Sequence, residues 1–259
     1  MILAAGRGTR MREARHVAAL DAAQAAAADD GRKGMIPFGR PFLDHVLHAL
    51  ADAGFCEVAL VIAPDHADVR RYYGSLPLTR LEVSCVTQAE PRGTADALLA
   101  AEAWTEGGPF ITLNSDNLYP VDVLAALACA EGPAVPGFRV TSLGLSIERA
   151  GAFALMECDA RGCLSRISEK PGAAAIEAAG ADAMISMNIW RFDSRIFDAC
   201  RDVPVSSRGE KELPQAAGLA ASRGTCFDVL PALGPVLDLS RREDVAAVAR
   251  ALEGARVAL

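Results

Sequence analysis

Residues 1–11 of the chain read Met-Ile-Leu-Ala-Ala-Gly-Arg-Gly-Thr-Arg-Met. The apolar residues at the start predict a short strand. The small residues that follow predict a tight turn whose backbone N–H groups can face a ligand. Arg10 adds a planar fork of donors that suits phosphate oxygens. The stretch therefore predicts a phosphate-binding loop at the carboxyl end of a strand.

The glycine spacing of this loop departs from two common phosphate-binding patterns. The Walker pattern G-x-x-x-x-G-K-[ST] is absent, and Met11 stands where the dinucleotide pattern G-x-G-x-x-G needs its third glycine. An ordinary strand-to-helix turn therefore stays open as the alternative, because an isolated glycine motif is a weak signal.

Composition narrows the class of protein. The net charge of −7 argues against non-specific binding to nucleic acid or to anionic membranes. No apolar run is long enough to span a bilayer, and no export signal is present, so we expect a cytoplasmic protein. The seven cysteines form no C-x-x-C pair, and we expect them to be small buried hydrophobic residues in a reducing compartment.

Strand and helix patterns alternate through the first half. Pro41 opens an amphipathic helix over 42–53, and apolar strands are predicted at 57–63 and 81–87. This alternation predicts a mainly parallel sheet with helices on both faces. The Ala-rich segment 12–32 is predicted to be partly helical up to Gly31, either as a flap over the loop or as a surface insertion.

Polar residues follow two of these strands where ligands bind in open parallel sheets. Residues 88–97 form a loop and a helix start capped near Thr94, and Asp116 follows a strand at 110–113. Asp116 is a candidate metal ligand, and capping of the helix that starts near Val121 stays open as its alternative role.

The second half changes to antiparallel patterns. Strands are predicted at 138–146, 152–157 and 164–169, and a further strand at 184–192 carries Asn188 in its middle. A buried Asn needs polar partners, which can be structural or part of a ligand. Ser240 and Glu243 have capping-box spacing and open a final helix. No linker divides the chain, so one domain over residues 1–259 is expected.

Eight motifs in order make the chain resemble the sugar-nucleotide pyrophosphorylases, which are sugar-1-phosphate nucleotidyltransferases. The resemblance implies an enzyme with a Rossmann-like, GT-A type, mostly parallel sheet flanked by helices and a mixed β region in the C-terminal half. It also implies a nucleotide-binding half at 1–135, a sugar-phosphate-binding half at 136–259, and a Mg²⁺-dependent reaction of an NTP with a sugar 1-phosphate that yields an NDP-sugar and pyrophosphate. The motifs are residues 3–11, 33–37, 88–97, 114–117, 169–171, 187–188, 208–214 and 236–238.

The resemblance also implies roles for individual residues. At the triphosphate, backbone N–H groups would come from the loop residues Ala5, Gly6, Gly8 and Thr9. Arg10 would hold the β and γ phosphates, and Lys33 would reach the α-phosphate. Asp116 and Asp238 would bind Mg²⁺. At the base, the matching positions are Leu3, Ala4, Gln88, Gly93 and Thr94. At the acceptor, Glu169 and Asn188 would contact sugar hydroxyls and Lys170 would neutralise the phosphate. Gln88 can both donate and accept, which suits uracil or thymine and favours UTP or dTTP.

Two departures from the family pattern bear on the substrate. Residues 11–32 form a longer segment between Arg10 and Lys33 than the family usually has. Phe153-Ala154 replaces a Tyr-Gly pair, so the methyl group of Ala154 would crowd the sugar. Alternatives therefore stay open: cytidylyl transfer to phosphocholine or a molybdenum cofactor, a non-catalytic sensing protein, or a glycosyltransferase that consumes NDP-sugars. No nucleic-acid or membrane partner is expected, and homo-oligomerisation stays open.

Overall fold

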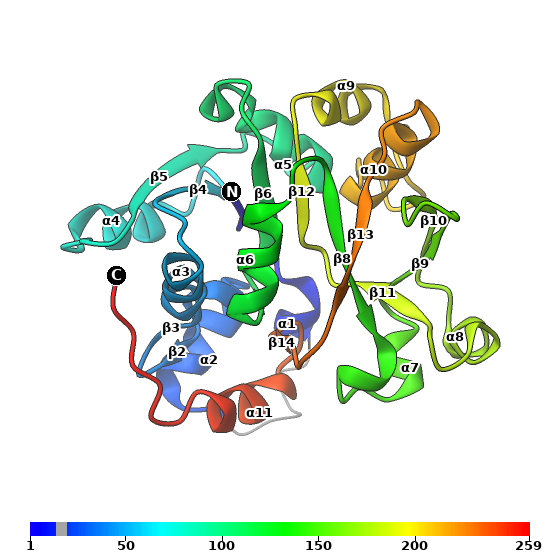
Figure 1. The fold of residues 1–259 in the computed structure, drawn as a ribbon. Coiled ribbons are helices and arrows are strands. Elements are labelled where there is room, and N and C mark those ends of the chain that lie inside the picture. Colours follow the sequence, from blue (N-terminus) through cyan, green and yellow to red (C-terminus); the bar gives the residue numbers. More distant parts are fainter. Residues whose placement is uncertain (14–19) are drawn as a thin grey trace.

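The computed structural model describes residues 1–13 and 20–259 and has an α/β fold built on one large sheet (Figure 1). In this part of the chain the sheet has ten strands. They run in the order β10-β9-β11-β8-β12-β6-β1-β4-β5, with β13 paired to β8. Helices cover both faces of the sheet, so the predicted α/β class is confirmed.

The strands of the first half pair in parallel. Ile2 lies opposite both Leu60 and Leu113, so β1 is central to this part of the sheet. The strand β4 is a continuous apolar run after its first residue because helices cover both of its sides. These parallel strands are β1 (Ile2–Leu3), β4 (Glu57–Ile62), β5 (Glu82–Thr87) and β6 (Phe110–Asn114).

The second half adds mostly antiparallel strands beyond β6. The strand β12 pairs with β6, and Trp190 lies opposite Thr112 at this change of direction. The strand β13 runs parallel to β8 and branches from the main order. These strands are β8 (Ala134–Arg139), β9 (Ala154–Cys158), β10 (Leu164–Glu169), β11 (Met184–Ser186), β12 (Trp190–Phe192) and β13 (Asp228–Ala232). Two short pairs complete the β structure, namely β2 (Pro37–Phe38) with β3 (Arg40–Pro41), and β7 (Asn117–Leu118) with β14 (Leu237–Asp238).

Two apolar cores lie on opposite faces of the sheet. One contains Phe42 of α3 and Leu124 of α6, and the other contains Leu98 of α5 and Phe197 of α9. No helix in the described ranges has the length and apolar character needed to span a bilayer. The helices are α1 (Thr9–Glu13), α2 (Ala22–Asp29), α3 (Phe42–Asp52), α4 (Ala67–Ser75), α5 (Thr94–Ala100), α6 (Val121–Cys129), α7 (Ile147–Ala150), α8 (Ala173–Ala179), α9 (Arg195–Asp202), α10 (Leu213–Ser222) and α11 (Asp244–Ala251).

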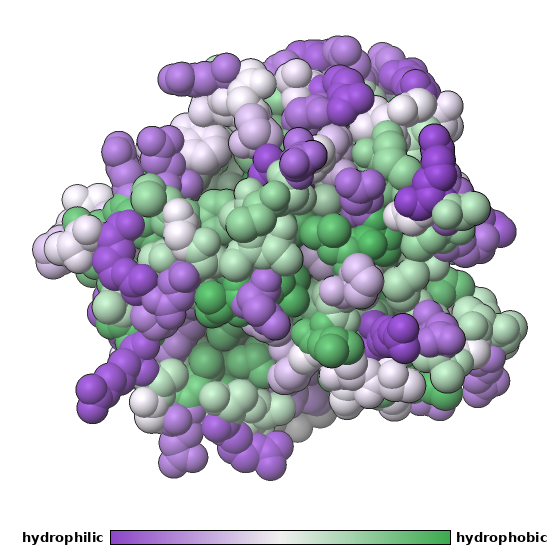
Figure 2. Space-filling view, in the orientation of Figure 1, coloured by the Kyte–Doolittle hydropathy of each residue, from purple (hydrophilic) through white to green (hydrophobic). Residues whose placement is uncertain are grey.

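The surface in the same orientation carries apolar residues across its middle and hydrophilic ones around its rim (Figure 2). Val121 at the start of α6 and Leu233 directly after β13 are among the large apolar side chains exposed to solvent. Single exposed apolar side chains are common on folded proteins and need no separate explanation.

The strand predicted over 184–192 is wrong in its middle. Asn188 has a φ of 60°, in the left-handed region, and this bend separates β11 from β12. Asn adopts this conformation more readily than most residues, and regular strand pairing is present on both sides of the break. The break lets β11 pair with β9 while β12 pairs with β6.

The strand predicted over 138–146 begins earlier and ends earlier than expected. The strand β8 covers 134–139, and Val140–Ser142 form a short 3-10 turn. Pro136 and Gly137 obscure the strand in the sequence. Gly137 is needed there, because a Cβ would lie 2.8 Å from Cγ1 of Val229 on the neighbouring strand.

Two predicted helix caps are also wrong. Gly93, not Thr94, is the cap residue of α5, because Thr94 Oγ1 accepts a hydrogen bond from the Leu213 backbone. The last helix, α11, begins at Asp244, and Ser240 donates its hydroxyl to Asp238 instead of capping it. Within the Ala-rich segment 12–32, α2 ends before Gly31 as expected, while the prediction for 14–19 lies outside the described residues.

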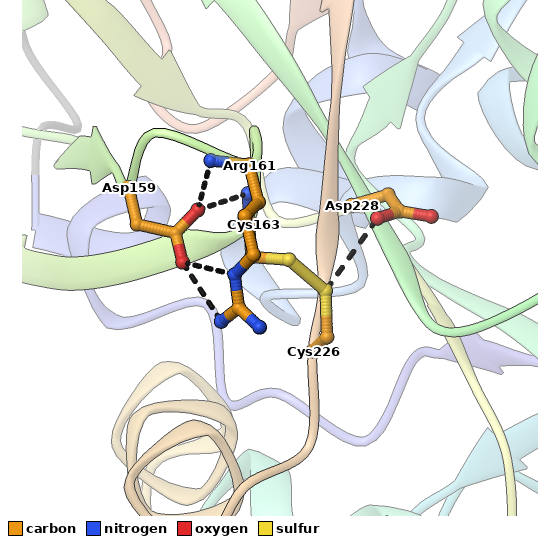
Figure 3. Close-up of a disulfide and its surroundings, with 5 residues drawn as sticks. All are labelled: Asp159, Arg161, Cys163, Cys226 and Asp228. Atoms are coloured by element: carbon orange, nitrogen blue, oxygen red, sulfur yellow. Dashed lines mark hydrogen bonds and ion pairs between the residues drawn. A yellow bond between two sulfur atoms is a disulfide. The ribbon is translucent and has the colours of Figure 1, made fainter.

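The prediction for the cysteines is wrong for most of them. Cys163 and Cys226 form a disulfide with their Cα atoms 5.5 Å apart (Figure 3). Cys56 and Cys129 are exposed free thiols, whereas Cys200 is buried as expected. Sequence spacing could not indicate the disulfide, because its two residues are 63 positions apart and meet only when β13 docks beside the β9–β10 turn.

Candidate active site

One cavity of about 440 Å³ collects all the residues predicted to form the site. It is bounded by the residues that follow β1, β5 and β6 and by the end of β10, so it lies at the carboxyl edge of the parallel strands. The predicted site residues that line it are Leu3, Ala4, Ala5, Gly6, Gly8, Thr9, Arg10, Lys33, Gln88, Gly93, Thr94, Asp116, Glu169, Lys170, Asn188 and Asp238.

The two glycines of the first loop occupy different environments. A Cβ added to Gly6 would meet no described atom within 4 Å, so its backbone is open to a ligand. Gly8 has a φ of +58°, and a Cβ there would lie 2.3 Å from the carbonyl oxygen of Gly31. Gly8 therefore holds the loop against the end of α2, whereas Gly6 leaves room for phosphate oxygens.

A lysine and an aspartate meet beside this loop. Lys33 begins a 3-10 turn, and its Nζ donates to Oδ2 of Asp116 at 2.7 Å. The side chains are 20 % and 16 % exposed, so the pair faces the cavity with little competition from bulk water. Arg10 lines the same cavity from α1. The loop, the lysine and the arginine together give the cavity a basic side that suits a polyphosphate.

The two predicted metal ligands are brought together by a short strand pair, because Asp116 directly precedes β7 and Asp238 lies in β14. Asp238 in β14 is the register partner of Asn117 in β7, and the Leu239 backbone donates to the carbonyl oxygen of Asp116 at 2.8 Å. One carboxylate oxygen of Asp238 accepts from Ser240 Oγ at 2.6 Å and from Asn117 Nδ2 at 3.2 Å. Burial and the nearby carboxylate of Asp116 raise the pKa of Asp238.

Sequence reasoning missed Arg149, which contacts Asp238 of this pair and the neighbouring Asp244. Its Nη2 lies 2.9 Å from Oδ2 of Asp238 and 2.7 Å from Oδ1 of Asp244. Both aspartates are almost fully buried, at 6 % and 7 % exposure. Arg149 lies in the four-residue helix α7, and no spacing in the sequence links it to either aspartate.

The donor set around Asp116 and Asp238 fits a divalent cation. The carboxylate of Asp116 adds to burial in disfavouring the ionised form of Asp238, as the raised pKa of Asp238 indicates. A cation between them would relieve this repulsion. Mg²⁺ is commonly held by one or two carboxylates together with substrate phosphates, and the basic loop adjoins this pair in the same cavity.

The loop predicted to contact a base is fixed to α10. A Cβ on Gly93, whose φ is +111°, would lie 2.3 Å from the carbonyl oxygen of Lys211, so only glycine allows this close approach. The Gln88 amide nitrogen donates to the Gly93 carbonyl at 3.1 Å and to Asp96 Oδ2 at 2.8 Å. These bonds orient the Gln88 side chain before any ligand arrives.

The predicted acceptor residues include two strained positions. Lys170 and Asn188 have φ values of 46° and 60°, which residues other than glycine rarely adopt. Such conformations persist at functional sites because the surrounding structure imposes them. Glu169 lies opposite Ala154 in the β9–β10 pair, and burial with the nearby Glu212 raises its pKa.

Two further cavity residues were not predicted to have a role. Arg208 lies in a motif that the resemblance includes, and it contacts Glu212 at 3.5 Å. Trp190 lines the cavity beside Asn188, and its buried Nε1 has no hydrogen-bond partner among the described residues. The sequence shows Trp190 only as an apolar residue of a strand.

Comparisons with known proteins show which sequences and folds this chain is similar to. The chain is 25 % identical over 246 residues to the UTP–glucose-1-phosphate uridylyltransferase AglF of Haloferax volcanii, covering 94 % of this chain and 92 % of that protein. It is 25 % identical to a glucose-1-phosphate thymidylyltransferase of Streptomyces antibioticus, covering 83 % of this chain and 55 % of the relative.

The fold is similar to a crystal structure of a UDP-glucose pyrophosphorylase complexed with UDP-glucose. The TM-score is 0.73 at 17 % identity, and the match covers 99 % of this chain and 100 % of the other. The sequence profile of the nucleotidyl transferase family matches residues 27–226, a range that includes Lys33, Asp116 and Glu169. This match covers well over half of the chain, so the chain belongs to the nucleotidyl transferase family.

Proposed function

We propose that this protein is a sugar-1-phosphate nucleotidyltransferase that joins UTP or dTTP to a sugar 1-phosphate and releases pyrophosphate. The observation that carries the proposal is the single cavity in which a glycine loop and Lys33 meet the acceptor wall of Glu169, Lys170 and Asn188. Relatives named as uridylyl- and thymidylyltransferases of glucose 1-phosphate support the substrate class.

The reaction places two polyanions together. An oxygen of the sugar phosphate attacks the α-phosphorus of the nucleotide, and the bond to the β-phosphate breaks as pyrophosphate leaves. Alignment and charge neutralisation account for most catalysis of this kind. In our proposal Arg10 binds the β and γ phosphates, and Lys33 contacts the α-phosphate. Lys170 neutralises the negative charge of the acceptor's phosphate group.

The carboxylates of Asp116 and Asp238 would hold Mg²⁺, which when bound screens the phosphate charges and polarises the α-phosphate. In our proposal Arg149, Ser240 and Asn117 fix the orientation of Asp238 through their hydrogen bonds to it. The two halves of the chain then have separate tasks, with 1–135 binding the nucleotide and 136–259 binding the sugar phosphate.

The orientation of Gln88 supports UTP or dTTP as the nucleotide. Both hydrogen bonds from its amide nitrogen go to protein atoms, so its carbonyl oxygen is the group left to meet a base. An acceptor at this position suits the N3–H of uracil or thymine, whereas cytosine presents an acceptor at N3. In our proposal Leu3, Ala4, Gly93 and Thr94 form the rest of the base-binding surface.

The test is a pyrophosphate-release assay with the four NTPs against a panel of sugar 1-phosphates, with phosphocholine included. We expect turnover with UTP or dTTP and a sugar 1-phosphate. We expect Asp116→Ala to abolish it, whereas Asp182→Ala at a surface ion pair should retain it. Turnover only with CTP and phosphocholine, or full activity of Asp116→Ala, would refute the proposal.

A further inference from the structure

The disulfide between Cys163 and Cys226 joins two elements that form the acceptor side of the cavity. Cys163 follows the turn between β9 and β10, and Cys226 precedes β13 (Figure 3). The far end of β10 is Glu169, which lines the cavity. The helix α10, which leads to Cys226, packs on β10 and starts at Leu213, another cavity residue. The disulfide therefore links the ends of β10 and α10 that lie away from the cavity.

The backbone holds the two cysteines near each other independently of the S–S bond, with Cys163 bridged to Asp228, two residues after Cys226. Leu164 N donates to the Phe227 carbonyl at 2.8 Å, and Val229 N donates to the Gly162 carbonyl at 3.0 Å. Oδ1 of Asp159 accepts from the Cys163 backbone at 2.9 Å and fixes the turn (Figure 3). These bonds flank the disulfide on both sides, so the two sulfurs stay close enough to re-form it after reduction.

The two cysteines differ in their exposure to solvent. Cys163 is buried at 6 % exposure, whereas Cys226 is exposed. Asp228 lies beside the exposed sulfur, with Oδ1 3.5 Å from Cys226 Sγ. We therefore expect an incoming thiolate to attack Cys226, and the carboxylate of Asp228 can accept a hydrogen bond from the Cys226 thiol once the bond is reduced.

A stack of aromatic rings connects the disulfide to the cavity. Phe227 follows Cys226 directly, and its ring meets Trp190 edge-on with the centroids 5.8 Å apart. Trp190 stacks on Phe192 at 5.6 Å and lines the cavity beside Asn188. Close-packed interiors transmit displacements, so movement of the chain at Cys226 would reach the acceptor wall through Phe227.

We propose that Cys163–Cys226 is a reversible redox modification site, reduced by a dithiol donor, whose state sets the affinity of the cavity for the acceptor. A thiolate of the donor attacks Cys226 Sγ, the S–S bond breaks, and its electron pair goes to Cys163 Sγ, which takes a proton from water. The second donor thiol attacks the mixed disulfide and releases Cys226, which also takes a proton, and the donor leaves as a disulfide. The effect on the acceptor rests on the proposed function.

The first test establishes the site itself. The protein is purified without reductant, and free thiols are counted before and after treatment with dithiothreitol. We expect five free thiols before and seven after, with a 163–226 cross-linked peptide found by mass spectrometry only before treatment. Seven free thiols in the untreated protein, even after incubation with an oxidised dithiol, would overturn the proposal.

The second test separates the acceptor from the nucleotide. The KM for the sugar 1-phosphate should rise about fivefold on reduction, at the lower end of typical coupling between sites, with the KM for the NTP unchanged. The combined variant Cys163→Ala with Cys226→Ser should show the higher KM with and without dithiothreitol. The matched control, Cys56→Ser with Cys129→Ser at exposed free thiols, should respond like the parent. Equal acceptor KM values in both states would overturn the proposal.

A third readout does not depend on turnover. Amide hydrogen exchange in β10 and at 190–192 should become faster on reduction, while exchange in β4 should stay the same. Unchanged exchange in β10 would overturn the coupling. Absence of turnover with every substrate pair, together with faster exchange in β10, would instead refute the proposed function and leave the redox site standing.

Discussion

Removing the disulfide should lower the thermal stability of this protein by an amount set by the length of chain that it closes. The two cysteines are 63 positions apart. A cross-link of this length reduces the entropy of the unfolded chain by an amount that corresponds to about 4 kcal/mol at 25 °C. For a chain of this size each kcal/mol shifts the melting temperature by about 2–4 °C, so the expected decrease is about 8–16 °C.

The variant for this test combines Cys163→Ala with Cys226→Ser. Alanine is used at the buried position because a serine there would add an unpaired hydroxyl group. The hydrogen bonds that flank the disulfide are made by backbone atoms and remain in the variant. The calculated decrease in the melting temperature therefore reports the absence of the cross-link, with little contribution from broken contacts.

Scanning calorimetry measures the melting temperatures of the parent, the variant and a control. Parent and variant are each heated with and without dithiothreitol, and only the oxidised parent should melt at the higher temperature. The control with Cys56→Ser and Cys129→Ser should behave like the parent. Melting temperatures within about 2 °C of each other in all samples would refute the reasoning, since that corresponds to no more than about 1 kcal/mol.

Three further predictions concern the cavity. Arg10→Ala should lower kcat by roughly two to four orders of magnitude, as for other lost transition-state contacts. The melting temperature of the protein should stay the same because Arg10 is exposed, and a normal kcat in a pyrophosphate-release assay would contradict the prediction. Arg149→Ala leaves two buried carboxylates without the guanidinium that pairs with them, so denaturant unfolding should show a free energy of unfolding lower by about 2 kcal/mol. This loss is smaller than for a fully buried pair because Arg149 is 31 % exposed, and Arg149→Lys should restore part of it. Burial and the nearby Glu212 raise the pKa of Glu169, so Glu169 should become protonated, and kcat/KM for the acceptor should drop, at a higher pH than for an ordinary glutamate. Glu212→Gln should shift this drop to lower pH, and an unchanged pH profile would show that Glu212 does not act on Glu169.

Much of the parallel half was predictable because local signals agree with the tertiary structure there. Pro41 precedes a helix with one apolar face, and the apolar run of β4 matches a strand covered on both sides. The gathering of Gly6, Lys33 and Asp116 in one cavity was also predictable, since they lie in motifs whose order along the chain matches a known family.

The remaining features depend on contacts between distant segments, which local patterns do not encode. The bend at Asn188 is imposed by two strands that pair with different neighbours. The hydroxyl of Thr94 could cap its own helix, but it accepts a hydrogen bond from Leu213 instead. Arg149 and the Cys163–Cys226 disulfide likewise join parts of the chain whose proximity only the complete fold establishes.

The order of the sheet also bears on how such proteins diverge. The hairpin of β9 and β10 carries Ala154 and Glu169 and joins the main sheet through β11, away from β1, β4 and β5. Mutations that reshape this hairpin leave the register of the parallel strands untouched. Under the proposed function, new acceptor preferences can evolve there, and we expect chimeras that exchange the hairpin between relatives to keep their nucleotide preference.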